Sequence, residues 1–244
     1  MVDVIEGHTV HKYDEELGNA RRLVLEMGGR VLEQVRKAIL ALDQGDIDLA
    51  REVIDHERET DADELRLDEA ILDLIATRQP VGRDLRFILA LSKITGDLER
   101  AGDKAAQIAW CVIRLMDRTN QRPASKILHH IHSLDQVARR QLERSLDAFA
   151  KIDMDLTLEV FENAPRSDEG FDTAIHHAMT FVFEGTLLVG QVLEIVFILR
   201  ALANIGNHAG NIARQIIFVV EGEDVRYQNK EILIDTLRKR KGGR

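Results

Sequence analysis

Apolar residues recur along most of this chain at intervals of three and four, the spacing of an amphipathic helix. Val53 and Ile54, followed by Ile71, Leu72 and Ile75, fit one such stripe. No alternating run of β-branched residues appears, and only three prolines interrupt the chain, against about a dozen for an average chain of this length. The pattern predicts an all-α protein with six long helices, near residues 11–42, 46–77, 82–117, 124–151, 153–185 and 189–221.

Two sequence patterns of the first half return about 105 residues later. Asp46-Ile-Asp-Leu matches Asp153-Met-Asp-Leu, and Leu98-Glu-Arg-Ala-Gly-Asp-Lys-Ala matches Leu202-Ala-Asn-Ile-Gly-Asn-His-Ala. Short connections between long helices favour antiparallel bundles, so the repeat predicts two tandem antiparallel three-helix bundles. We place the first bundle at residues 8–120, the second bundle at 121–227 and a basic tail at 228–244. Within that tail, we expect the end from 238 to 244 to be solvated.

Carboxylates occupy positions where the helix pattern would place core residues. Carried from Ile54 to Ile71, the apolar stripe falls on Glu57, Asp61, Glu64 and Asp68. The next predicted helix carries Glu99 and Asp103 one turn apart, on or beside its own stripe. Acidic side chains are rarely buried unless they are paired or bound, and clustered like charges repel one another. We therefore predict a cation site formed by Glu57, Asp61, Glu64, Glu99 and Asp103; the alternative from spacing alone is a solvated acidic face.

The residue types of this predicted site restrict which metal ions could bind there, but they do not identify one ion. Oxygen-only ligands suit hard or borderline ions, which leaves iron, zinc, manganese, magnesium and calcium open. Carboxylate-bridged di-metal enzymes of helical bundles need a Glu-x-x-His pattern, whereas Gly102 follows Glu99 and Thr60 follows Glu57 at that position. We expect no enzyme. The competing readings are a metal-dependent enzyme of that bundle type and a metal-free helical scaffold.

Composition excludes some classes of protein. A formal net charge of −9 and an aromatic content of 5% argue against a nucleic-acid-binding protein. The single cysteine, Cys111, allows no internal disulfide and fits a reducing cytoplasm. Residues 1–8 contain neither a basic nor an apolar run, so we expect no signal peptide. The most apolar stretch, 187–203, is interrupted by polar residues, which predicts a buried helix rather than a membrane span.

Several short motifs, in this order and spacing, resemble those of the PhoU family. The resemblance covers residues 8–227. The motifs that carry it are Met27-Gly28-Gly29, Arg78-Gln79-Pro80, Asp84-Leu85-Arg86, Leu98-Glu99-Arg100-Ala101-Gly102-Asp103, Gly206-Asn207-His208 and Val220-Glu221-Gly222. The paired glycines interrupt a strong helix, and we interpret them as a place of close helix–helix approach.

The resemblance implies a regulator of phosphate uptake that represses the phosphate regulon when phosphate is plentiful. It implies two partners, the ATPase of a phosphate ABC transporter and a phosphate-sensing histidine kinase, and only indirect membrane association. It also implies multinuclear metal clusters on Glu/Asp-x-x-x-Asp motifs, which here are Glu57/Asp61 and Glu99/Asp103. We further expect a homodimer that binds no nucleic acid.

The second half departs from the family pattern. Ala203 and Asn207 replace the glutamate and aspartate of the first half, and Ala164 stands where an acid is expected. Asp168 remains, with His208 as a poor substitute ligand. We therefore expect a lost or weakened second metal site, and metal that stabilises the first bundle while leaving the second almost unaffected.

Overall fold

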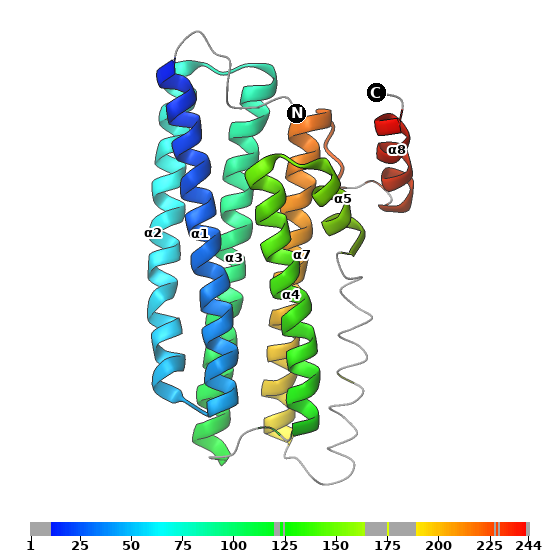
Figure 1. Cartoon of the computed structure of the whole chain (residues 1–244). Helices are drawn as coiled ribbons and strands as arrows, with labels where there is room; N and C mark the ends of the chain where they lie inside the picture. Colours follow the sequence, from blue (N-terminus) through cyan, green and yellow to red (C-terminus); the bar gives the residue numbers. More distant parts are fainter. Residues whose placement is uncertain are drawn as a thin grey trace.

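The computed structural model describes residues 11–119, 123, 125–163, 175, 189–226, 228 and 230–242, and all regular structure in these residues is helical (Figure 1). The all-α prediction is confirmed. The helices are α1 (His11–Gln44), α2 (Ile47–Arg78), α3 (Gly82–Thr119), α4 (Ser125–Lys151), α5 (Met154–Asn163), α7 (Val189–Glu221) and α8 (Lys230–Gly242).

The helices form the two groups that the repeat predicts. α1, α2 and α3 form one bundle, and α4, α5 and α7 stand beside it (Figure 1). Five of the predicted helices begin and end within about two residues of observed ones. The other, predicted over 153–185, is described only at its start, where α5 ends at Asn163; nearly all of the rest lies outside the described residues.

One hydrophobic core runs through both groups. α3 and α7 pack along each other, and the same cluster of buried residues continues from α1 and α2 through α3 to α4 and α7. Phe87 of α3 and Phe149 of α4 stack across the junction, with ring centroids 6.1 Å apart and both rings almost fully buried. The two bundles therefore share a core instead of forming separate domains joined by a linker.

The first sequence repeat encodes the same helix start twice. The Asp46 side chain accepts hydrogen bonds from the backbone N–H groups of Asp48 and Leu49, at 3.0 and 2.9 Å. The Asp153 side chain accepts from Asp155 at 2.8 Å and from Leu156 at 3.2 Å. Each aspartate satisfies two N–H groups that the first turn leaves without a partner, which begins α2 and α5 at equivalent points.

The glycine pair of α1 allows a close approach to α4. A Cβ atom at Gly28 would lie 2.6 Å from a methyl carbon of Leu146, whereas a Cβ atom at Gly29 would meet nothing within 4 Å. Gly28 is therefore the packing residue of the pair, as the sequence suggested, and Gly29 faces outward.

The predicted basic tail contains a docked helix. Leu233 and Leu237 of α8 are almost fully buried, in a cluster with Phe161 of α5 and Val225. On its outer side α8 forms ion pairs, including the one between Arg238 and Glu162 at 2.5 Å. The two leucines lie just before the end expected to be solvated, and the side chains described there, at 238–240, are exposed. Being four residues apart, the leucines form a short apolar face that docks the helix.

α7 is the most apolar helix. By length and composition, Gly190–Glu221 could cross a membrane, and 61% of its most apolar window is buried inside the structure. It packs between α3, α4 and α5, and this position in the core accounts for its composition.

Candidate metal site

The four acidic residues of α2 that the sequence placed inward flank its buried stripe instead of forming it. Glu57 and Glu64 are half-buried, and Asp61 and Asp68 are exposed. Leu72, which the pattern placed inward, is 66% exposed. The buried positions follow steps of three, four and seven and are Ala50, Val53, Thr60, Asp63, Leu67, Ile71 and Leu74. The stripe predicted from the sequence is therefore wrong in register: over the polar gap it was continued one position off the true core line.

A close approach of α3 to α1 and α2 positions the acidic residues. A Cβ atom at Gly102 would lie 3.2 Å from the Thr60 methyl group and 3.3 Å from Gln34 Oε1. Gln34 Nε2 donates to Thr60 Oγ1 at 3.1 Å and to the His56 carbonyl at 2.9 Å. This buried polar layer holds the helices together directly beneath the carboxylates.

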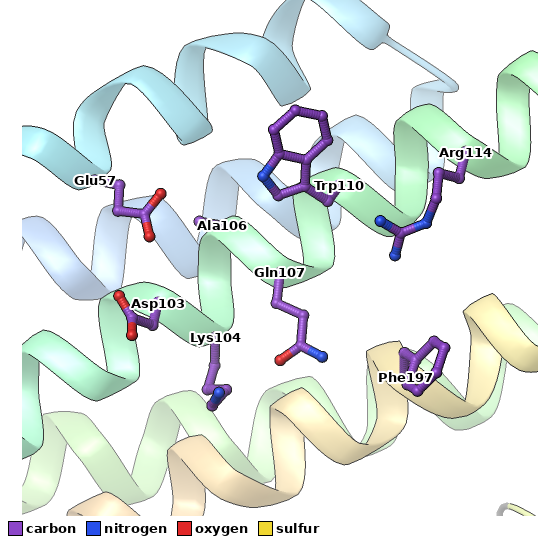
Figure 2. Close-up of a pocket in the computed structure, with 8 residues that line it drawn as sticks. All are labelled: Glu57, Asp103, Lys104, Ala106, Gln107, Trp110, Arg114 and Phe197. Atoms are coloured by element: carbon purple, nitrogen blue, oxygen red, sulfur yellow. The ribbon is translucent and has the colours of Figure 1, made fainter.

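Three carboxylates from the two helices converge. Oxygen atoms of Asp61, Glu99 and Asp103 all lie within 4.8 Å of one another. Glu57 from α2 faces Asp103 from α3 (Figure 2), and the charge of Asp103 contributes to the raised pKa of Glu57. Like charges this close repel one another, so the arrangement favours a bound cation or protons on some of the carboxyl groups.

The pKa values of three carboxyl groups at this site are raised, in part because negative charges lie close together. Burial, followed by the charge of Asp103, raises the pKa of Glu99 to about 7. Burial and then Asp103 also raise the pKa of Glu57. For Glu64, burial and the neighbouring Asp68 raise the pKa, although Arg100 opposes them. A cation would relieve this repulsion, and the donor set, carboxylate oxygens alone, suits a hard or borderline ion.

The five predicted ligands do not all lie at the centre of the acidic site. Asp61, Glu99 and Asp103 form the convergent set, and Glu57 extends it along Asp103. Glu64 lies one turn further along α2, beside Gly96, and acts on Glu99 through its charge.

In the second half, the residue proposed as a substitute ligand has another partner. His208 Nδ1 lies 2.8 Å from Asp97 Oδ1, across the contact between α7 and α3. Asp168 and Ala164 lie outside the described residues. His208 therefore joins the two bundles through Asp97.

Besides Glu194, three buried carboxylates were not predicted as buried from the sequence. Asp97, Asp63 and Asp135 are at most 8% exposed. Arg30 Nε donates to Asp63 at 2.7 Å, and Arg139 holds Asp135 in a two-bonded pair. The spacing of Asp135 and Arg139, one turn apart, could have indicated their pair, whereas the partner of Asp97 is 111 residues away.

A groove of about 420 Å³ continues from the acidic site along α3 (Figure 2). Glu57 and Asp103 line one end, and Lys104 and Gln107 point toward α7. Two exposed aromatic side chains, Trp110 and Phe197, line the rest together with Arg114.

Comparison with known proteins gives one consistent result. A family model described as PhoU domain matches residues 24–112 and 131–216. The chain is 36% identical over 225 residues to the Pseudomonas aeruginosa phosphate-specific transport system accessory protein PhoU homolog, covering 92% of each chain. It is 31% identical to the corresponding PhoU protein of Escherichia coli K12, over 91% of each.

Solved structures agree. The crystal structure of PhoU from Pseudomonas aeruginosa superposes with a TM-score of 0.81 at 34% identity, covering 86% of this chain and 100% of that one. The phosphate transport system regulatory protein PhoU from Streptococcus pneumoniae has a TM-score of 0.79 at 23% identity, covering 87% and 98%, and shows the likeness of fold.

Proposed function

This chain belongs to the PhoU family, and from that premise we propose that it is an accessory protein of phosphate transport that regulates phosphate uptake. The main support is that the PhoU family model matches both repeats, over 24–112 and 131–216. The named relatives also align along more than nine-tenths of their length. These relatives carry the names of accessory proteins, not of enzymes.

In this role the protein is a negative regulator. It acts as a cytoplasmic adaptor between the ATPase of the phosphate ABC transporter and a phosphate-sensing histidine kinase, and it approaches the membrane only through them. As a homodimer, it represses the phosphate regulon when phosphate is plentiful. The family motifs and the relatives' association with phosphate-specific transport support this assignment.

A deletion strain tests the regulatory role. We expect a phosphate-starvation reporter to be expressed in high phosphate after deletion and to be silent again when the intact gene is restored. A reporter that stays silent in the deletion strain would contradict the proposal.

The acidic site is proposed as a metal site for one or more divalent or trivalent ions. Asp61, Glu99 and Asp103 are the central ligands, with Glu57 and Glu64 at the edges. The support is convergence of oxygen ligands together with raised pKa values, which indicate charge that neighbouring cations leave uncompensated.

A paired substitution tests the metal assignment. We expect Glu99→Ala with Asp103→Ala to abolish bound metal in elemental analysis of the purified protein, since two of three convergent ligands are lost. The matched control is Glu69→Ala with Asp73→Ala, which removes two exposed carboxylates with the same spacing on α2 and should keep the metal. Full metal content in the first variant would show that the ligands lie elsewhere.

A further inference from the structure

Two crevices lie at equivalent places along the contact between α3 and α7. One is the groove beside the acidic site, lined by Trp110 and Phe197. The other, also about 420 Å³, lies toward the opposite end of the contact and includes Lys93 and Arg214 in its wall. The alignment that pairs Leu98 with Leu202 also pairs Phe197 with Lys93 and Trp110 with Arg214. The repeat therefore replaces two aromatic rings by two cations.

Arg214 is the most informative of these residues. It is more than half buried, and burial lowers the pKa of its guanidinium. Its partners are the Asn211 side-chain oxygen at 2.5 Å and the ring of Phe161, 5.5 Å from the guanidinium carbon. Within the described part of the chain it has no carboxylate in ion-pair contact. Asp97, which lines the same pocket, opposes this lowering through its charge, but it makes no ion-pair contact with Arg214. A partly buried cation whose contacts are neutral groups is costly unless an anion joins it.

Further donors line the same pocket. Lys93 reaches it from α3, where its ammonium lies 5.2 Å from the ring centre of Phe218 and makes no ion pair among the described residues. Arg100 and the Ser92 hydroxyl come from the same helix. Arg226 also lines the cavity but is paired with Asp224 at 2.6 Å. The other three cationic side chains and the hydroxyl form a donor set for a tetrahedral oxyanion.

The pocket also holds acceptors, and these restrict the anion. Gln215 Oε1 is buried and has no hydrogen-bond partner. Glu64 and Asp68 line the side formed by α2, and Asp97, which contacts His208 and Asn211, lines the side formed by α3. A fully ionised anion such as sulfate offers these oxygens no proton and is repelled by the carboxylates, whereas hydrogen phosphate carries a hydroxyl that can donate to one of them.

We propose that this pocket between the two bundles binds a small protonated oxyanion of the phosphate type. Lys93, Arg100 and Arg214 bind its charged oxygens, and Gln215 or a carboxylate accepts its proton. The choice of phosphate among such anions rests on the proposed function. The pocket is distinct from the acidic metal site, although Glu64 lies between them.

Equilibrium dialysis of the full-length protein against labelled phosphate, in sulfate-free buffer with a chelator, tests this site. We expect saturable binding of phosphate and arsenate, and at least about tenfold weaker binding of sulfate, since each lost charge-assisted or donor contact changes affinity by about that factor. Absence of saturable phosphate binding up to about ten millimolar overturns the proposal. Equal binding of sulfate overturns the assignment of a protonated anion. A preference for AMP over free phosphate would assign the pocket to nucleotides instead.

Three single variants and one double variant locate the binding. Arg214→Gln and Lys93→Gln should each weaken phosphate binding about tenfold or more. Lys104→Gln makes the same charge change in the other crevice and should leave binding unchanged. Glu99→Ala with Asp103→Ala should also retain it, because it disrupts only the metal site. Circular dichroism checks folding, and if Arg214→Gln does not fold, the partly exposed Lys93 decides. Equal losses in the Lys93 and Lys104 variants would overturn the location.

The phosphate-binding test and the reporter test can fail independently of each other. Loss of reporter control with intact phosphate binding would remove the proposed function and leave this site standing. Reporter control without any phosphate binding would remove this site alone.

Discussion

At the scale of single residues, the carboxylates between α2 and α3 hold protons that isolated side chains would release. Burial and the charge of the neighbouring Asp103 both favour the neutral forms of Glu57 and Glu99. Protons and metal ions therefore compete for the same carboxylates, because either can neutralise their negative charge.

This competition predicts how stability depends on pH without metal. The pKa of Glu99 rises from 4.5 to about 7 on folding, so the folded state binds an extra proton between these values. Stability should therefore fall as pH rises from about 4.5 to about 7. Urea unfolding midpoints in chelator should show this slope, and Glu99→Gln should flatten it. The exposed control Glu69→Gln should keep the original slope, and an unchanged profile in Glu99→Gln would contradict the assignment.

At the scale of helices, two glycines allow neighbouring helices to pack closely. Gly28 brings α1 against α4, and Gly102 brings α3 against the layer of Gln34 and Thr60 beneath the acidic site. Such contacts tolerate little added volume, because interiors are packed as densely as organic crystals.

The glycine pair of α1 provides an internally controlled test. Gly29→Ala should raise the free energy of unfolding by about 1 kcal/mol, because alanine favours a helix and the added methyl group meets nothing within 4 Å. Gly28→Ala gains the same propensity but forces Leu146 aside, which costs about 1–3 kcal/mol. Chemical denaturation should thus rank Gly28→Ala below Gly29→Ala by about that amount. Equal stabilities would show that Leu146 moves aside freely.

At the scale of the whole molecule, the shared core couples the two bundles. α3 and α7 pack in one continuous cluster, and polar contacts reinforce the junction. Arg114 Nε donates to the buried Glu194 at 2.9 Å, and His208 meets Asp97. Independent responses of the two halves, expected from the asymmetry of their metal motifs, do not fit this arrangement.

We therefore predict one cooperative unfolding transition. The fluorescence of Trp110, the single tryptophan, reports on α3, and circular dichroism reports on every helix; their melting curves should coincide. Bound metal should shift both curves together, by about 2.7 kcal/mol at a hundredfold excess over Kd or several degrees in Tm. A metal-dependent shift in fluorescence alone would indicate separately folding bundles.

The sequence alone determined the features that repeat locally. Helix positions followed from apolar spacing, and the ends of α2 and α4 were predicted closely because helix periodicity acts over a few residues. The matching of Asp46 with Asp153 revealed the repeat, since the same cap begins both helices. The co-occurrence of the pairs Glu57/Asp61 and Glu99/Asp103 likewise identified the acidic cluster before any geometry was known.

Only the tertiary structure decided which polar residues meet. It placed Glu57 beside the core of α2 instead of within it, paired His208 with Asp97, and left the partly buried Arg214 without an ion pair among the residues that the structure describes. It also docked α8 through Leu233, in a segment for which the sequence predicted only a basic tail. These contacts join residues far apart in the chain, and their energies depend on burial and on neighbours across a helix interface, which no local pattern records.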